Sequence, residues 1–373
     1  MKNLWSERAA AAAIKRYASR GVNGDVALRV YTTRLLGGDP RLVIHGGGNT
    51  SVKTRMKDIT GRELEVLCVK GSGWDMGGIE PPGLPAVRLE PLRELAVLED
   101  LSDEDMVNVQ RGNLLDSTAP NPSVETLLHA FLPHKFIDHT HSNAVLALTD
   151  QPDGDLICRE LYGDRAALVP YIMPGFALAK KAMEVQLANP DCEGLILLKH
   201  GVFSFGETAK EAYDRMIRLV TLAERRISKA KRQAMVQVRL PKKLMNPAEV
   251  APILRGLCAL PEGDEAKRFV ITFRSDTKIR KYVSARDLQR ISQDGNVTPD
   301  HSIRIKPVPL IVPAPNAADP DGFRIAAAAA MVDFRRRYRD YFKTNNAMSP
   351  VKKIRLDDSP RVILVPGVGL FGI

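Results

Sequence analysis

The sequence predicts an α/β fold: a central sheet flanked by helices, followed by a smaller second α/β domain. Short apolar runs alternate along the chain with longer stretches of helical periodicity. Several of these runs end in glycine-rich or polar loops, as strands do in α/β proteins. The run EGLILLKHG is almost continuously apolar, which is typical of a strand buried on both faces.

The expected elements follow in order from the N-terminus. Residues 6–36 predict a helix that ends at the strong stop GGDP. RLVI predicts a short strand that leads into GGGNTS, and LEVLCV a second strand that leads into KGSGWD. Helices are expected at 91–99, at 103–112 and in NPSVETLLHAFLP. KFIDHTHSN and EGLILLKHG then predict strands, and an amphipathic helix is expected from about Glu207 to Gln233.

A shift in composition marks the expected domain boundary. VRLPKKLMNPAEVAP, residues 238–252, is interpreted as a linker between a domain at 1–237 and a smaller one at 253–373. The second domain offers the strands RFVITF, IRIKPVPLIV and RVILVPGV and a helix from about Phe323 to Phe342. No helix follows the last strand to cover it, so the second domain is either truncated at the C-terminus, as in a fragment, or belongs to a shortened protein.

The composition limits which kinds of partner the protein can have and where in the cell it is expected. The net charge is +10 and the pI about 9.4, but the basic clusters at 225–232 and 335–339 lie on expected helices with few aromatic residues. Solvated helix faces explain them best, steering of a phosphorylated metabolite comes second, and no nucleic-acid partner is expected. No apolar run approaches the ~20 residues that span a bilayer, so no membrane partner is expected. The dispersed cysteines and the absence of a signal peptide predict a cytoplasmic protein with reduced thiols.

Three histidines form a candidate metal site. Side chains alternate along a strand, so His139 and His141 point to the same face. His200 ends the apolar strand EGLILLKHG, where the next glycine permits close approach. Three histidines with one open position are typical of catalytic rather than structural zinc. Hydrogen-bonded sheet histidines explain an H-x-H pair equally well, so spacing alone leaves both interpretations open.

A carboxylate lies shortly upstream. Glu125 falls in the first turn of the helix expected from PSVETLLHAFLP, off its apolar stripe, with His129 four residues later. A purely structural role is possible, in which the negative charge of Glu125 complements the positive end of the helix dipole. From spacing alone, that structural interpretation is favoured. For His129, a place in the core or behind the metal ligands is expected.

The glycine-rich loops are candidate anion sites. In HGGGNTS and KGSGWD, backbone N–H groups and hydroxyl or amide side chains can approach a phosphate, although glycine after a strand is also ordinary turn chemistry. Residues 367–372 match G-x-G-x-x-G. Dinucleotide binding would need a following helix and a later acidic residue, so this segment is not interpreted as a nucleotide site.

Taken together, GGGNTS, KGSGWD, P-S-x-E at 122–125, H-T-H at 139–141 and K-H-G at 199–201 resemble, in order, the motifs of class II, zinc-dependent sugar-phosphate aldolases of the aldolase/adducin family. The stretches GGGNTSVK, VKGSGWD, PAVRLEPL, KFIDHTHSNA, TPDHSIR and RVILVPGVGLFG are similar to one subgroup, the aldolase half of bifunctional rhamnulose-1-phosphate aldolase/alcohol dehydrogenases. The likeness runs from about residue 25 to the end of the chain.

The resemblance implies a set of site residues and a cofactor. It implies one Zn²⁺ per subunit, or another divalent ion, held by His139, His141 and His200, with Glu125 as the catalytic acid and base. It implies a substrate phosphate bound by Asn49, Ser51, Gly71, Ser72 and Ser123. Tyr171 in PYIMPG is similar to the tyrosine that acts from a neighbouring subunit in fuculose-phosphate aldolases. Family members are homo-tetramers, so a homo-oligomer is expected.

The sequence departs from the family in two places. Many relatives carry a second serine before the catalytic glutamate, where this chain has Val124. That difference leaves the preferred phosphate ester open. The bifunctional relatives also continue into a dehydrogenase domain that the sequence does not contain.

The function expected from the resemblance is that of an aldehyde-lyase. It would cleave a ketose 1-phosphate of the rhamnulose 1-phosphate type to dihydroxyacetone phosphate and an aldehyde, as in rhamnose catabolism. An epimerase or dehydratase of sugar phosphates could use the same site, and a non-catalytic adducin-like interaction module is a further alternative.

Overall fold

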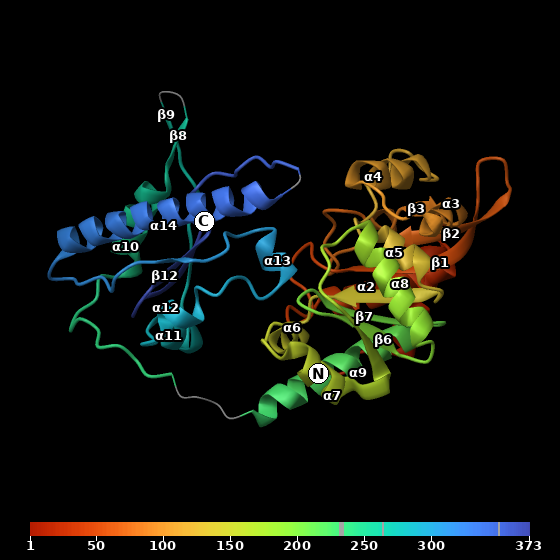
Figure 1. The fold of residues 1–373 in the computed structure, drawn as a ribbon, viewed down its shortest axis with the longest axis horizontal. Helices are drawn as coiled ribbons and strands as arrows, with labels where there is room; N and C mark the ends of the chain where they lie inside the picture. Colours follow the sequence, from red (N-terminus) through yellow and green to blue (C-terminus); the bar gives the residue numbers. More distant parts are fainter. Residues whose placement is uncertain (231–234, 263–264, 350) are drawn as a thin grey trace. The chain divides into compact units, whose positions relative to one another are not determined.

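The computed structural model describes residues 1–230, 235–262, 265–349 and 351–373 (Figure 1). The chain divides into two compact units. Unit 1 comprises Met1–Ala230 together with the short segment Val297–Asp300, and unit 2 comprises Lys231–Asn296 and His301–Ile373. Unit 1 therefore contains a piece of chain that comes from within the sequence of unit 2.

Two helices open unit 1 where the sequence predicts one. α1 (Glu7–Ala18) and α2 (Gly24–Gly37) are separate, so the single helix expected over 6–36 is wrong. Gly21 adopts φ +74° between them, and the Asn23 side chain accepts a hydrogen bond from the Asp25 N–H as the N-cap of α2. A left-handed glycine ends a helix and an asparagine starts one, which is why the chain breaks here.

A seven-stranded sheet forms the centre of unit 1, in the order β3-β2-β1-β4-β7-β6-β5. Its strands are β1 (Asn49–Lys57), β2 (Glu63–Val69), β3 (Ala86–Arg88), β4 (Phe136–Thr140), β5 (Ala166–Val169), β6 (Gly194–Leu197) and β7 (Gly201–Gly206). β5 and β6 pair in parallel, and every other pairing in this sheet is antiparallel. The sheet brings β1 beside β4, and β4 beside β7.

Helices cover both faces of this sheet (Figure 1). One layer contains α3 (Leu89–Glu94), α4 (Asp103–Gly112), α5 (Thr126–Phe131) and α8 (Phe176–Ala188), and the short 3₁₀ turn η2 (Leu95–Val97) follows α3. The 3₁₀ turn η1 (Pro81–Gly83) instead contacts α2. The other contains α2, α6 (Asn143–Thr149), α7 (Gly154–Tyr162), η3 (Gly163–Arg165) and α9 (Ala209–Lys229). Along β2, Leu67 packs into the first layer and Val66 into the second, as strand alternation requires. The α/β class with a central sheet and flanking helices is confirmed.

Three local expectations in unit 1 need correction. RLVI is not a strand, because residues 41–48 form turns and the strand begins only at Asn49. The glycine run therefore precedes its strand, and Leu42 and Val43 are buried as part of the helical layer. The helix expected over 91–99 is shorter, with α3 giving way to η2. Within the helix expected over 207–233, α9 ends at Lys229, and residues 231–233 lie outside the described residues.

Unit 2 is a smaller α/β assembly. Its helices are α10 (Pro247–Cys258), α11 (Thr277–Val283), α12 (Leu288–Ile291), α13 (Pro299–Ser302) and α14 (Pro320–Met348), with α13 beginning in the segment assigned to unit 1. Its sheet has the order β10-β13-β12-β11, formed by β10 (Thr272–Arg274), β13 (Gly369–Gly372), β12 (Val362–Val365) and β11 (Leu310–Ile311). β8 (Leu260–Glu262) and β9 (Glu265–Lys267) form a separate hairpin.

Three expectations for this unit differ in extent. Of the expected strand RFVITF, only Thr272 and Phe273 lie in a strand, β10. α14 is longer than the expected 323–342, and only two residues of IRIKPVPLIV form a strand. The glycine-rich stretch 367–372 forms the turn and second strand of the β12–β13 hairpin.

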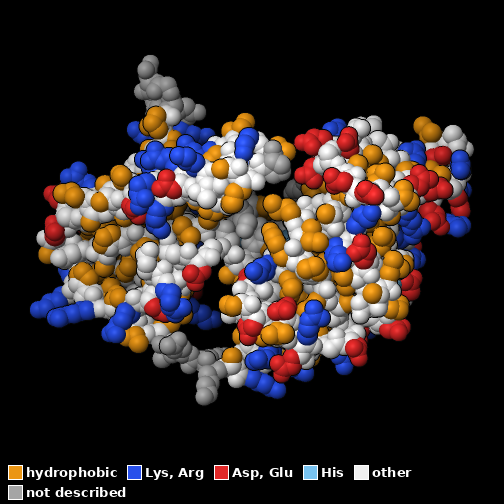
Figure 2. All heavy atoms as spheres, viewed as in Figure 1, with side chains coloured by type: hydrophobic (Ala, Val, Ile, Leu, Met, Phe, Trp, Pro, Cys, Tyr) orange, Lys and Arg blue, Asp and Glu red, His pale blue; other side chains and the backbone are white. Residues whose placement is uncertain are grey.

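Charged side chains of both signs are interspersed with apolar ones on the face shown in Figure 2. Lys and Arg exceed Asp and Glu by 54 to 44, which gives the net charge of +10. Among the described residues, no helix has the length and apolar character needed to cross a bilayer.

Candidate active site

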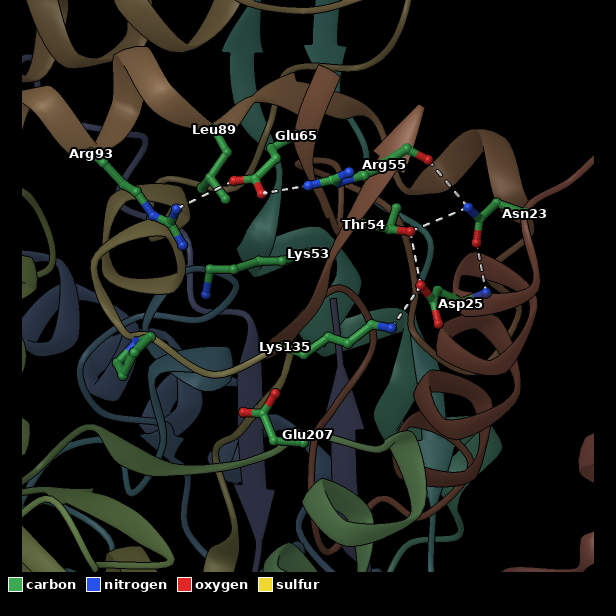
Figure 3. A pocket seen from close by; sticks show the side chains of 11 residues that line it. Asn23, Asp25, Lys53, Thr54, Arg55, Glu65, Leu89, Arg93, Lys135 and Glu207 are labelled. Carbon is green, nitrogen blue, oxygen red and sulfur yellow. Dashed lines mark hydrogen bonds and ion pairs between the residues drawn. The ribbon is translucent and has the colours of Figure 1, made fainter. Parts of the chain in front are cut away.

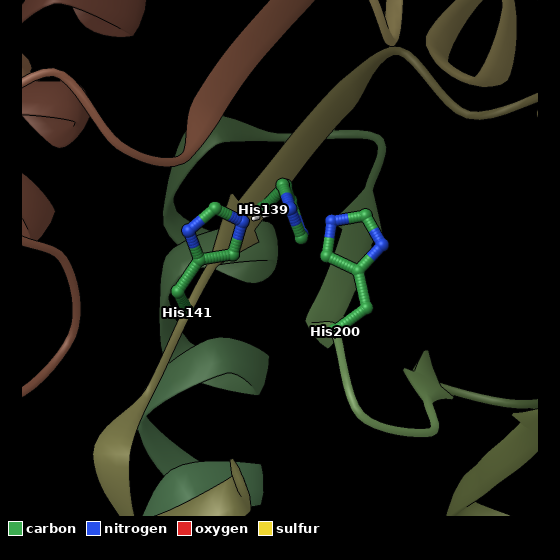
Figure 4. A group of neighbouring side chains, drawn as sticks. All are labelled: His139, His141 and His200. Atoms are coloured by element: carbon green, nitrogen blue, oxygen red, sulfur yellow. Dashed lines mark hydrogen bonds between the residues drawn. The ribbon is translucent and has the colours of Figure 1, made fainter. Parts of the chain in front are cut away.

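Three imidazoles converge at one end of the unit 1 sheet (Figure 4). His139 lies near the end of β4, His141 follows that strand directly, and His200 lies in the turn between β6 and β7. β4 pairs with β7 so that His139 faces Phe203, which brings the turn beside the H-T-H segment. One ring nitrogen from each histidine lies within 4.8 Å of the others, and no other such group of ligands occurs in the described part of the chain.

The tight turn that presents His200 depends on its neighbours. Lys199 adopts φ +58°, an uncommon left-handed conformation for a residue with a side chain. A Cβ on Gly201 would lie 2.5 Å from the Thr140 carbonyl oxygen and 3.0 Å from His139 Cε1. Only glycine therefore allows this turn to approach the two strand histidines.

Hydrogen bonds fix the orientation of two of the rings. His139 Nδ1 lies 3.2 Å from the Val202 carbonyl oxygen, and His141 Nδ1 lies 2.6 Å from Asp300 Oδ1. Both partners are acceptors, so each Nδ1 carries the proton and each Nε2 keeps its lone pair. The two Nε2 atoms face each other at 2.9 Å. Two lone pairs at that distance repel unless a proton or a cation lies between them.

The surroundings disfavour a proton as the bridging charge. Burial lowers the pKa of His139 well below its ordinary value, and the neighbouring His141 and His200 lower this pKa further. Burial also lowers the pKa of His200, against the opposing effect of Glu125. His139 additionally stacks on Phe203 with the ring centroids 4.1 Å apart. Neutral imidazoles in a partly apolar setting are suited to a divalent metal ion.

A carboxylate completes the cluster. Glu125 occupies the N-cap position of α5, and its Oε2 lies 3.4 Å from His139 Nε2 while its Oε1 lies 3.3 Å from His200 Nε2. Among the described residues, Glu125 Oε1 is buried without a hydrogen-bond partner. A buried polar atom of this kind requires an explanation, and an ion or substrate group bound between this carboxylate and the ring nitrogens would supply one. The donor set therefore fits a metal ion.

A hydrogen-bonded chain holds Glu125 in place. The Asn49 amide Nδ2 donates to Glu125 Oε2 at 2.6 Å and to Ser123 Oγ at 3.1 Å. Asn49 Oδ1 accepts from His129 Nε2, and the Ser51 hydroxyl lies 2.7 Å from His129 Nδ1. Burial lowers the pKa of His129 well below its ordinary value, so this ring is neutral and can relay one donor and one acceptor. β1 brings Asn49 here because Asn49 pairs with His139 on β4.

The remaining residues expected to bind phosphate are Gly71, Ser72, Ser123 and Ser51, and they differ in how deeply they are buried. Gly71 bridges to Pro122 across the two loops, and the Ser72 N–H donates to the Asn121 carbonyl at 2.7 Å. The KGSG loop therefore lies directly beside the P-S-x-E segment. Ser72 is exposed and Ser123 is buried, and Ser51 is fully buried against His129.

Tyr171 is the expected residue that the structure does not bring to the cluster. Its side chain is 57% exposed, and its hydroxyl lies 4.0 Å from Met173 Sδ. The sequence expectation assigned this tyrosine to the site of a neighbouring subunit.

Sequence reasoning missed Asp300 as a partner of the site. It belongs to TPDHSIR, a stretch noticed only through the resemblance, and it lies 159 positions from His141. A carboxylate in a recurring motif was the available signal, but no spacing rule connects residues so far apart in the chain.

A cavity of about 530 Å³ lies elsewhere on unit 1 (Figure 3). Its charged walls pair with one another: Glu65 contacts Arg55 at 3.8 Å and Arg93 at 3.6 Å, and Asp25 contacts Lys135 at 2.9 Å. It contains none of the residues expected to bind metal or phosphate. The candidate active site is therefore the histidine cluster.

Comparison with known proteins agrees with this geometry. Residues 28–227 match the family model described as the class II aldolase and adducin N-terminal domain, and residues 245–373 match a model described as the second domain of class II aldolases.

The individual relatives differ in their sequence identity to this chain and in the share of their length that this chain covers. The chain is 34% identical over 379 residues to the uncharacterized oxidoreductase YuxG of Bacillus subtilis, covering 99% of this chain and 52% of that protein. It therefore spans about half the length of this relative. The structure of the N-terminal class II aldolase domain of a conserved protein from Thermoplasma acidophilum is 40% identical, with a TM-score of 0.54, covering 61% of this chain and 99% of that one. The L-fuculose-1-phosphate aldolase of Thermus thermophilus is 20% identical, with a TM-score of 0.36, covering 54% and 95%.

The first model covers more than half of the chain. The family expected from the motifs is confirmed: this protein belongs to the class II aldolase and adducin family.

Proposed function

We propose that the protein is a metal-dependent aldehyde-lyase that cleaves a ketose 1-phosphate of the rhamnulose 1-phosphate type into dihydroxyacetone phosphate and an aldehyde. The observation that carries the proposal is the convergence of three imidazoles on one point, with the Glu125 carboxylate 3.3 and 3.4 Å from two of their nitrogens. Membership of the class II aldolase family supports an enzyme of the lyase type.

His139, His141 and His200 would hold Zn²⁺ or another divalent ion. When bound, the ion supplies Lewis-acid stabilisation of the negative charge that develops on the substrate as its carbon–carbon bond breaks. The proton positions on His139 and His141 leave their Nε2 lone pairs directed into the cluster.

Glu125 would exchange the proton of the reacting carbon. In the cleavage direction the bonding electrons stay on the three-carbon fragment, and that carbon takes a proton to become dihydroxyacetone phosphate. The hydroxyl of the other fragment loses a proton and becomes the aldehyde. The Asn49 amide holds Glu125 Oε2, which leaves Oε1 to carry the proton. Tyr171 from a neighbouring subunit of a homo-oligomer would serve the hydroxyl that becomes the aldehyde oxygen.

The two loops that meet beside Glu125 would bind the phosphate. The hydroxyls of Ser72 and Ser123 are the proposed donors, where the KGSG loop meets the P-S-x-E segment at Gly71. Asn49 would act by holding Ser123 and Glu125, because both hydrogens of its amide are already donated to them. Ser51 would act indirectly, because its hydroxyl is buried against His129. Binding the phosphate away from the reacting bond positions the substrate for cleavage.

The test is a substrate panel on the metal-loaded protein. Rhamnulose 1-phosphate, fuculose 1-phosphate and ribulose 5-phosphate are incubated separately, and the products are identified by mass spectrometry and NMR. Cleavage to dihydroxyacetone phosphate is the expected result. An epimer or a dehydrated sugar as the product would assign the same site to a different reaction.

Two variants connect the activity to the site. Glu125→Gln should keep the metal and lower kcat by about 10²- to 10⁴-fold, because it removes the proton carrier. His200→Ala should lose the metal together with cleavage. Glu207→Gln, a change at an exposed glutamate, is the matched control and should retain activity. Full cleavage by His200→Ala free of metal would refute the proposal.

A further inference from the structure

The geometry points to Asp300 as a positioning residue that sets the metal affinity of the site by holding His141. This inference rests on the proposed metal site and extends it to the segment Val297–Asp300, which lies far along the chain from the histidines. It gives a role to TPDHSIR, a motif of the resemblance that the proposed reaction leaves unused.

Asp300 makes directed contacts to His141 and Ile44 within unit 1. Its Oδ1 accepts from His141 Nδ1 at 2.6 Å, and its Oδ2 accepts from the Ile44 N–H at 2.8 Å. The residue is 1% exposed, so this carboxylate has been removed from water. A buried carboxylate is costly unless it is paired or hydrogen-bonded, and a histidine and a backbone amide provide the compensation here.

The glycine run is shaped to receive this carboxylate. A Cβ on Gly47 would lie 1.7 Å from Asp300 Oδ1 and 2.2 Å from its Cγ. Any other residue at that position would push the carboxylate away from His141. The middle glycine of HGGGNTS therefore makes room for Asp300.

The three histidines receive unequal support. His139 Nδ1 faces a neutral carbonyl at 3.2 Å, whereas His141 Nδ1 faces a carboxylate at 2.6 Å. Within the described residues, His200 Nδ1 has no hydrogen-bond partner. A carboxylate behind a histidine fixes its tautomer and increases the donor strength of the other nitrogen, and its loss typically lowers metal affinity about 10- to 100-fold. Asp300 is thus the strongest support in the set.

The contact between Asp300 and His141 joins two parts of the chain that are far apart in sequence. The residues on both sides of Val297–Asp300 belong to unit 2, while the segment itself belongs to unit 1. A ligand of the metal in unit 1 is therefore oriented by a residue that lies between two stretches of unit 2 in the sequence.

The experiment measures metal binding by the full chain. Metal-free protein is titrated with Zn²⁺ against a chromophoric chelator of known affinity, for the parent, Asp300→Asn and Asp300→Ala. Asp294→Asn, an exposed aspartate six residues earlier in the same stretch, is the matched control. Affinity should fall about 10- to 100-fold in Asp300→Ala, less in Asp300→Asn, whose amide oxygen can still accept a hydrogen bond, and not at all in Asp294→Asn.

A second readout reports directly on His141. Ring ¹⁵N shifts of the metal-free protein identify which nitrogen carries the proton. We expect the Nδ1–H form in the parent and a mixture of tautomers in Asp300→Ala. If Asp300→Ala does not fold, the Zn²⁺ titration and the ¹⁵N shifts of Asp300→Asn test whether Asp300 positions His141.

The outcomes separate the two proposals. Parent protein that binds no Zn²⁺ would refute the metal site itself. Parent protein that binds Zn²⁺, with unchanged affinity and tautomer in both Asp300 variants, would refute the positioning role alone. Weaker binding in those variants would support the role, whichever substrate the panel identifies.

Discussion

At the residue scale, a buried ion pair supports β4, the strand that carries His139 of the histidine cluster. Arg29 of α2 and Asp138 of β4 pair with both side chains fully buried, and Arg29 Nη1 also donates to the carbonyls of Ser51 at 3.2 Å and Ile137 at 3.3 Å. Burial raises the pKa of Asp138 and lowers the pKa of Arg29, each against the attraction of its partner. Desolvation therefore opposes the Coulomb attraction between the two side chains.

Removing one charge of the Arg29–Asp138 pair should lower the free energy of unfolding more than replacing both charged residues by apolar ones. Asp138→Ala leaves an uncompensated buried guanidinium and should lower the free energy of unfolding by about 3–5 kcal/mol. The double variant Arg29→Met, Asp138→Leu removes both charges and should be more stable than either single variant. Urea unfolding followed by circular dichroism measures all three.

Lys135→Met is the control for this comparison, because Lys135 pairs with Asp25 at a partly exposed site. Its cost should stay below about 1 kcal/mol. A double variant less stable than both single variants would show that the pair stabilises the fold beyond the cost of burying it.

At the scale of elements, Lys53 connects strand β1 to the end of α5. Its Nζ donates to the carbonyls of His129, Leu132 and His134 at 2.8, 2.6 and 2.7 Å. The carbonyls in the last turn of a helix lack intrahelical partners, so this ammonium satisfies acceptors that the helix cannot. Burial lowers the pKa of Lys53 from 10.5 to about 7. α5 follows Glu125 directly, so this contact also steadies the segment that carries this glutamate.

Lys53→Met should lower the free energy of unfolding by about 2–4 kcal/mol, because it leaves buried carbonyls without donors. The lowered pKa of Lys53 also makes the free energy of unfolding depend on pH. The folded state releases the Lys53 proton near pH 7 and the unfolded chain near pH 10, so the unfolded chain binds more protons in between. The contribution of Lys53 to stability therefore rises with pH from about 7 to about 10.

Urea unfolding at several pH values measures this slope. The parent should gain stability relative to Lys53→Met across that window. Lys57→Met, at an exposed position of the same strand, should follow the parent. Parallel pH profiles for the parent and Lys53→Met would contradict the lowered pKa.

At the scale of the whole molecule, the metal should stabilise one unit selectively. All three histidines, Glu125 and Asp300 belong to unit 1. Both tryptophans of the chain, Trp5 and Trp74, belong to it as well, so tryptophan fluorescence reports on this unit alone. A ligand that binds only the folded state stabilises it by about 2.7 kcal/mol at a free concentration of 100 times its Kd.

Adding Zn²⁺ to the metal-free protein should raise the midpoint of the fluorescence-detected thermal transition. Calorimetry should show that a transition invisible to fluorescence, assigned to unit 2, stays unchanged. The variant His139→Ala, His141→Ala should lose the shift. An equal shift in that variant would mean that the ion binds elsewhere.

Much of the site could be anticipated because it depends on local patterns. Strand alternation places His139 and His141 on one face, and K-H-G places His200 at a strand end. The antiparallel register that sets Asn49 opposite His139 could not be read from spacing, since strand order is a property of the sheet. The break between α1 and α2 was missed although Gly21 and Asn23 mark it, because helical composition on both sides concealed a short turn.

The sequence by itself determined the α/β class, the family and the three candidate ligands, because periodicity and short motifs are encoded in neighbouring residues. Only the tertiary structure decided how those ligands are held: His129 joins Asn49 to Ser51, and Asp300 reaches His141 across 159 positions. Hydrogen bonds act over about 3 Å in space and are indifferent to separation along the chain, so the groups that orient the ligands become visible only once the chain is folded.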